Sequence, residues 1–324
     1  MGILKTITDE YFGETVRKED EINIDGLDVE IVSFTDNNGN IHRRGYKPKD
    51  KDNLKELLER MIEVRGDEGD FNDIDTSDIT TMTSLFENNK TFNGDITGWD
   101  VSSVKYMSYM FKYAESFNQP IGDWNVSNVK DMYNMFRGAT SFNQSIGNWN
   151  VSNVDIMSYI FKDATSFNQP IGDWDVSNVE NMKGMFYSAT SFNQPIGDWN
   201  VSCVIDMDNM FSNATSFNQP IEKWNVSNTE YMSRMFYNAT SFNQPIEKWD
   251  VSGVMYMDSM FYDATSFNKP IGDWDVSSVI DMDFMFKYAT SFNQNLSKWN
   301  LIGKETKDMF YSCPIKDEYK PDME

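Results

Sequence analysis

The sequence is poor in the side chains that build most catalytic and metal centres. Its 324 residues include 2 cysteines and a single histidine, His42. A Ser-His-Asp or Cys-His arrangement would have to use that histidine, and zinc needs a tetrahedral set of such ligands close together. No glycine-rich phosphate loop is present either. We therefore expect neither an enzyme nor a bound cofactor.

The sequence also predicts neither a disulfide bond nor a membrane-spanning segment. Cys203 and Cys313 are separated by several repeats of the chain, which places them roughly 20 Å apart if repeats stack at strand spacing. A disulfide needs Cα atoms within about 7 Å, so we predict two free thiols. No apolar run could cross a bilayer, and residues 1–20 lack the apolar core of a secretory signal. We expect no direct membrane insertion, and a cytoplasmic location stays open.

Basic residues are outnumbered. Lys and Arg total 28 against 51 Asp and Glu, for a net charge of −23. Such a field repels phosphate backbones, so we expect no nucleic-acid partner. A solvated acidic coat is the simplest interpretation of the excess.

The dominant feature that the sequence does contain is a period of 25 residues. The stretch FNQPIGDWNVSNVKDMYNMFRGATS at 117–141 is copied along most of the chain. Phe-Asn recurs at this spacing from Phe92 to Phe292, and all 9 tryptophans keep it from Trp99 to Trp299. A fixed period of this size is typical of a solenoid, in which each unit stacks on the next.

Each repeat divides into two predicted elements. Apolar residues from Val129 to Ala139 recur every three or four positions, which predicts a helix of about three turns. Residues 116–121 are too short for a helix, and we expect a short strand there that pairs in parallel between repeats. Trp124 and Met135 recur in every repeat and are expected in the core. The fold prediction is α/β, a right-handed leucine-rich-repeat solenoid of about ten coils with an N-terminal helical cap.

The flanking regions do not repeat. Alternating residues at 28–34 and 41–46, with a polar turn at 36–40, predict a β-hairpin within residues 1–48. An apolar stripe over 53–64 predicts a capping helix within 49–72. We assign 73–312 to the solenoid and 313–324 to a C-terminal tail.

The repeat motif F-N-Q-P-I-G-D-W-N-V-S-N-V-x-x-M-x-x-M-F-x-x-A resembles that of the bacterial BspA-like leucine-rich repeat surface proteins, over about residues 45–312. The resemblance implies a curved solenoid and a role in cell-surface adhesion or host-protein binding. It implies a cell-surface or secreted location and carries over no catalytic residue.

The variable positions of the repeat carry the candidate binding residues. Tyrosine offers a large contact area at low entropic cost and is enriched in interfaces. Alternatively, these rings cover the methionine layer from outside. The candidates are Tyr106, Tyr109, Tyr113, Tyr133, Tyr159, Tyr187, Tyr231, Tyr237, Tyr256, Tyr262 and Tyr288.

A calcium site is a second hypothesis. Carboxylates flank two tryptophans, at Asp173 and Asp175 and at Asp273 and Asp275, and stacked repeats could bring such oxygens together. Lysine occupies the equivalent position in other repeats, however, so we favour turn and capping roles and expect no metal.

These observations predict a non-catalytic protein-binding or adhesion module that engages a host or neighbouring-cell protein. The alternatives are a structural scaffold that self-associates and an intracellular docking solenoid.

Overall fold

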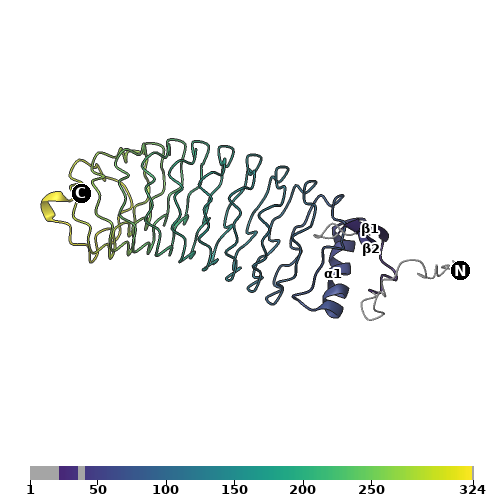
Figure 1. Ribbon diagram of the computed structural model, residues 1–324. Helices are drawn as coiled ribbons and strands as arrows, with labels where there is room; N and C mark the ends of the chain where they lie inside the picture. Colours follow the sequence, from purple (N-terminus) through teal and green to yellow (C-terminus); the bar gives the residue numbers. More distant parts are fainter. Residues whose placement is uncertain (1–21, 36–40, 323–324) are drawn as a thin grey trace, which may run out of the picture.

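The computed structural model of the protein describes residues 22–35 and 41–322. The repeats stack along one gently curved axis, with the N-terminal elements at one end and the C-terminal tail at the other (Figure 1). Strands β1 (Val29–Thr35) and β2 (Ile41–Pro48) form an antiparallel pair, followed by helix α1 (Lys51–Arg65). The turn predicted at 36–40 lies outside the described residues.

Helix α1 covers the first repeat. The Asp50 carboxylate caps it by accepting from the backbone N–H of Asn53 at 3.0 Å, and Gly66, with φ of 78°, ends it. Leu54, Leu57, Leu58 and Met61 on one face are buried in the same core as the repeats. This apolar face closes the end of the stack that would otherwise be open to water.

The C-terminal residues cover the opposite end. The N–H of Lys316 donates to Asn293 Oδ1 at 3.0 Å, and Tyr319, in the short 3₁₀ helix η2 (Asp317–Tyr319), accepts from Leu296 N at 2.8 Å. Cys203 and Cys313 are both free, as predicted. Burial raises the pKa of the Cys313 thiol to about 11.

The prediction of an α/β leucine-rich-repeat solenoid is wrong. Over the described residues, α1 is the one α-helix, β1 and β2 are the two strands, and the repeats themselves consist of turns and isolated bridges. Residues 129–139 are not helical, and residues 116–121 form no strand. The corrected description is a stack of turn-built repeats.

The segment predicted as a helix is a succession of tight turns. Met135 N donates to Met132 O at 3.1 Å, three residues back, whereas an α-helix would bond four back. Alternate N–H groups leave the repeat altogether, as where Asn134 N donates to Ser158 O at 3.0 Å. Successive turns separate apolar residues by three or four positions, as a helix does. The spacing therefore could not distinguish the two structures.

These turns require left-handed residues. Asn134 has a φ of 55° and Gly138 a φ of 70°, and the equivalent positions of the other repeats also have positive φ. A positive φ at the third residue of a turn is characteristic of type II. The backbone at this side pairs from repeat to repeat through parallel bridges at Thr81, Tyr106, Asp131, Ile156, Asn181, Asp206, Tyr231, Tyr256, Asp281 and Glu305.

At the predicted strand, a side-chain ladder replaces backbone pairing. Asn118 N donates to Asn93 Oδ1 at 2.9 Å, and Asn143 N donates to Asn118 Oδ1 at 2.9 Å. Pro120 follows closely and has no N–H to contribute to a β-ladder. The amide oxygens of the asparagines therefore take the place of backbone carbonyls.

The core prediction is confirmed. The rings of Phe117 and Phe142 stack with centroids 5.9 Å apart, and Met135 is completely buried. The Trp124 indole is 4% exposed and its Nε1 donates to Ile96 O at 3.3 Å. Each layer of the core is thus bonded to the layer before it.

Candidate functional site

One side of the stack is formed by the turn segments. We call the outward-facing residues of these segments the ladder face. The segments are 81–88, 106–113, 131–138, 156–163, 181–188, 206–213, 231–238, 256–263, 281–288 and 305–312. Every tyrosine proposed from the sequence as a contact residue belongs to this face.

The residue types on the ladder face change from repeat to repeat. Its backbone bridges join every pair of neighbouring repeats, whereas side-chain contacts such as Lys183 with Asp208 at 3.0 Å join only some of them. Elsewhere on the surface, polar side chains make hydrogen bonds within a repeat and between repeats. Asn125 Oδ1 accepts from Ser127 N at 3.2 Å, and Asn128 Nδ2 donates to Ser102 O at 2.7 Å in the preceding repeat. Substitutions there would remove hydrogen bonds. On the ladder face the backbone makes the bonds that recur in every repeat, so the side chains can differ.

The structure gathers the tyrosines into two runs. In the first, Tyr133 packs edge-on against Tyr109 at 5.1 Å and against Tyr159 at 6.1 Å between ring centroids. Tyr106 belongs to the same repeat as Tyr109, and 48% of its surface is exposed. The rings of this run come from consecutive repeats.

The second run lies nearer the C-terminus. Tyr231 and Tyr256 stack at 5.5 Å, and Tyr237 and Tyr262 stack at 4.6 Å. Tyr288 meets the edge of Tyr262 at 5.5 Å. Most of these rings are half-buried, so one face or edge rests on a neighbour while the rest contacts solvent.

Cations are interleaved with the first run. Lys112 pairs with Glu87 at 2.9 Å and lies 4.8 Å from the Tyr109 ring centroid. Lys162 Nζ lies 3.8 Å from the centroid of Tyr187, within the range of a cation–π interaction. The sequence analysis did not identify these cations. The available signal was a basic residue directly after Phe in three successive repeats, at Lys112, Arg137 and Lys162.

Burial sets the ionisation of this face. It raises the pKa of the phenols of Tyr109, Tyr159 and Tyr237 above the ordinary value, with neighbouring phenols contributing further. It lowers the pKa of the Lys162 ammonium, and the nearby Arg137 charge lowers it further. The phenols therefore remain protonated near neutral pH and keep their hydrogen-bond donors.

Three of the four carboxylates of the calcium hypothesis have other partners. Asp175 accepts from Ser177 N at 3.1 Å, and Asp275 accepts from Ser277 N at 3.0 Å, which are turn-forming bonds. Asp273 pairs with Lys298 at 2.6 Å and lines an open depression beside Trp274 and Trp299. Among the described residues, none of Asp173, Asp175, Asp273 and Asp275 belongs to a group of side chains with metal-ligand spacing.

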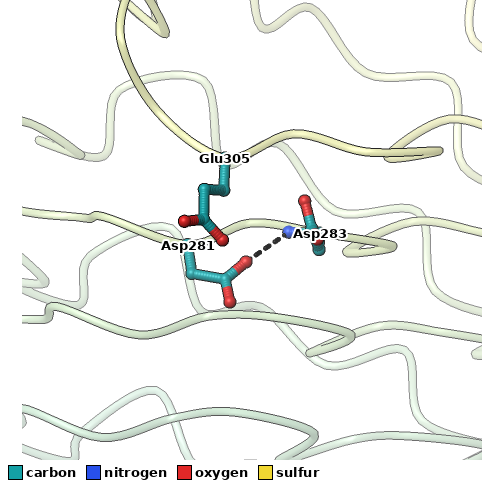
Figure 2. A group of neighbouring side chains, drawn as sticks. All are labelled: Asp281, Asp283 and Glu305. Carbon is teal, nitrogen blue, oxygen red and sulfur yellow. Dashed lines mark hydrogen bonds between the residues drawn. The ribbon is translucent and has the colours of Figure 1, made fainter.

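A different group of acids does have that spacing. Carboxylate oxygens of Asp281, Asp283 and Glu305 all lie within 4.8 Å of one another at the C-terminal end of the ladder face (Figure 2). Asp281 accepts from Asp283 N at 2.8 Å, so part of the arrangement is a turn bond. Burial, together with the neighbouring carboxylates, raises the pKa of Asp281.

The model of a family described as "Mycoplasma protein of unknown function, DUF285" matches residues 53–173, 156–254 and 219–320. The chain belongs to this family. The matches in tandem agree with a repeat protein. None of the curated proteins matches the chain.

Two further sequence predictions concern the membrane and the histidine. Within the described residues, no helix has the length and apolar character needed to cross a bilayer. The backbone of His42 belongs to β2, and its side chain lies outside the described structure.

Proposed function

We propose that the protein is a non-catalytic protein-binding module whose ladder face contacts a protein partner. The observation that carries the proposal is the contrast between the two kinds of exposed position. Polar residues with structural hydrogen bonds hardly change between repeats, whereas the ladder face varies and carries the tyrosines. A face whose side chains change from one repeat to the next while the backbone bridges stay the same is free to be shaped by recognition.

Covering of the methionine layer does not require a tyrosine in every repeat. The repeat at 206–213 has Asp206, Asp208, Asn209 and Asn213 at its outward positions and no tyrosine. Its methionines are nevertheless completely buried, and Ser212, at the position of Tyr187 and Tyr237 in the flanking repeats, is buried as well.

Tyrosine is suited to that role on physical grounds. Its ring buries a large apolar area, its hydroxyl donates and accepts, and few rotatable bonds are immobilised on binding. Stacking within each run, as for Tyr237 and Tyr262 at 4.6 Å, limits the rotamers before a partner arrives. Such preorganisation lowers the entropic cost of association.

A triple substitution tests the proposal. In Tyr231→Ser, Tyr237→Ser and Tyr262→Ser combined, we expect normal circular dichroism and loss of the protein captured by the wild-type chain in a pull-down. The matched control replaces the same three residues by Phe, which keeps the rings and should retain most of the binding. Unfolding of the Ser variant would instead support the covering role.

We propose in addition that the module is displayed at the cell surface and functions in adhesion. This rests on the likeness of its repeat to BspA-like surface proteins. Protease treatment of intact cells should then digest the chain, while a cytosolic marker survives. Survival of the chain would favour intracellular docking instead.

Self-association is the alternative that the same face permits. Light scattering at several concentrations separates the two proposals. A partner-binding module should keep the mass of one chain, whereas a scaffold should gain mass as concentration rises.

A further inference from the structure

We infer that Arg137 and Lys162 form a subsite on the ladder face for a single oxyanion, the carboxylate of an acidic side chain on the protein partner. This inference rests on the proposed function and specifies its chemistry. The two cations occupy the same position in adjacent repeats, and their backbones lie side by side. The N–H of Gly138, the residue after Arg137, donates to Lys162 O at 2.7 Å. The rings that precede them, Phe136 and Phe161, stack 5.8 Å apart.

Neither cation has an ion-pair partner among the described residues. This distinguishes them from most other cations of the ladder face. Lys183 lies 3.0 Å from Asp208, Arg234 lies 3.6 Å from Asp258, and Lys287 is likewise paired. A chain with a net charge of −23 has no shortage of carboxylates. Two neighbouring cations left without one repel each other, and an anion between them would relieve that repulsion.

The Arg137 guanidinium is incompletely hydrogen-bonded. Its Nε is buried from solvent and has no hydrogen-bond partner, and its Nη1 reaches Asn134 Oδ1 at the long distance of 3.4 Å. A buried N–H without a partner is costly, and a guanidinium presents paired donors that match a carboxylate. The buried Nε lies out of reach of a ligand at the surface, but the terminal nitrogens can meet an oxyanion, since Nη1 has only the long bond to Asn134 and Nη2 bonds to no described residue.

Tyrosine rings frame the two cations. Arg137 lies 5.5 Å from the centroid of Tyr113, while Lys162 lies 3.8 Å from Tyr187 and 5.7 Å from Tyr159. These rings restrict the cations and partly exclude water, which strengthens a charge-assisted hydrogen bond. Their exposed edges would contact the apolar part of the side chain that carries the oxyanion.

The surroundings limit the size of the ligand. Asp163 adjoins Lys162 and favours its charged form, and Asp206 and Asp208 lie two repeats further along. With a screening length of about 8 Å at physiological salt, a polyanion extending past the two cations would meet these carboxylates. A nucleic acid or an anionic membrane is therefore disfavoured, and an isolated acidic side chain fits.

The test uses the full chain and blocked peptides of sequence Gly-Glu-Gly-Glu-Gly, with Gln in place of Glu as the neutral form. We expect saturable binding of the Glu peptide by titration calorimetry and none of the Gln peptide. Combined Arg137→Gln and Lys162→Gln should weaken binding about tenfold or more. The matched control, Lys105→Gln with Lys130→Gln, removes the same charge at exposed positions, one in the repeat of Arg137 and one in the repeat before it, and should change affinity less than about twofold.

Several results would overturn the subsite. Equal binding of both peptides, or equal weakening in the two double variants, would mean contact without a defined oxyanion site. Binding of a phosphoserine peptide alone would overturn the carboxylate assignment. Lys162→Gln alone, measured with the same peptides, covers the case in which the double variant does not fold. The triple Tyr→Ser variant at 231, 237 and 262 should bind the Glu peptide normally, so failure here leaves the proposed function separately testable.

Discussion

The ring of Tyr159 lies directly against Gly184 in the next repeat. A β-carbon added at Gly184 would come within 2.3 Å of two ring carbons, and Gly184 has a φ of 56°. The same relationship joins Tyr113 to Gly138. Tyr159 and Tyr113 therefore occupy space that is open only because the facing residue in the next repeat is glycine.

Gly184→Ala should destabilise the protein by about 1–2 kcal/mol, since it adds a left-handed alanine and a clash with the ring. Urea unfolding measures the change. Adding Tyr159→Ser should restore the part due to the clash and leave the backbone part. Strict additivity of the two substitutions would show that the ring and the glycine are not coupled.

Left-handed positions without glycine should discriminate by side-chain shape. Ser188 has a φ of 55°, so Ser188→Val should lower the free energy of unfolding by about 1–2 kcal/mol, while Ser188→Gly should leave it unchanged or raise it slightly. Lys130→Val, at an exposed position next to the ladder face without a positive φ, is the control and should have little effect. Tolerance of valine at 188 would contradict the turn description.

The tryptophan hydrogen bonds offer a matched pair. Trp174 Nε1 donates to Ile146 O at 3.0 Å, whereas the buried Nε1 of Trp299 has no partner. Replacement of either by Phe removes a similar ring volume, but only Trp174→Phe removes a hydrogen bond, and only Trp299→Phe removes a buried N–H that has no partner. The Ile146 carbonyl keeps its bond from Trp149 N at 3.1 Å in either case. We expect Trp174→Phe to be more destabilising by about 1–2 kcal/mol in thermal unfolding. Equal losses would mean that the bond contributes nothing measurable.

The acidic group at the C-terminal end predicts a pH effect. The pKa of Asp281 is raised in the folded state, so its negative charge opposes folding at neutral pH. Protonation of Asp281 as pH falls removes this unfavourable contribution to the free energy of folding. Asp281→Asn keeps the oxygen that accepts from Asp283 N and should stabilise the protein by about 0.5 kcal/mol at pH 7. The gain should shrink as pH falls through the raised pKa of Asp281 and vanish below the ordinary aspartate pKa, where the wild-type carboxyl is protonated in both the folded and the unfolded state.

Asp275→Asn is the control of opposite sign. Hydrogen bonds from Ser277 lower the pKa of Asp275, so its charge favours folding above the ordinary aspartate pKa. The variant should be less stable than the wild type at pH 7, and the difference should disappear as pH falls through the lowered pKa. The same direction of change in both variants would contradict the electrostatic interpretation.

Part of this structure could be derived from single residues. Trp124, Phe117 and Met135 are buried because their apolar area is removed from water in every repeat. The buried residues of α1 lie on one face because side chains three and four positions apart point to the same side of a helix; they are Leu54, Leu57, Leu58 and Met61. The tyrosines were assigned to outer positions because they alternate with small and charged residues.

The pairing of cations and rings was not accessible in this way. Lys162 and Tyr187 are one repeat apart in sequence and contact each other across the stack. Arg137 is identified as unpaired only once the positions of all nearby carboxylates are known. The signal at the left-handed positions, Gly138, Asp163, Asn213, Asn238 and Asp263 before alanine, is visible in the sequence but was overridden by the helical spacing.

The sequence by itself determined the 25-residue period, the composition of the core and the location of α1, because burial of apolar area depends mainly on which residues recur together. Tertiary structure decided that the repeats are turns and not helices. Met132 and Met135 have a spacing that suits either. The choice depends on the N–H groups that lie between them. Asn134 N donates to the Ser158 carbonyl of the next repeat, and Tyr133 N donates to the Asp131 carboxylate.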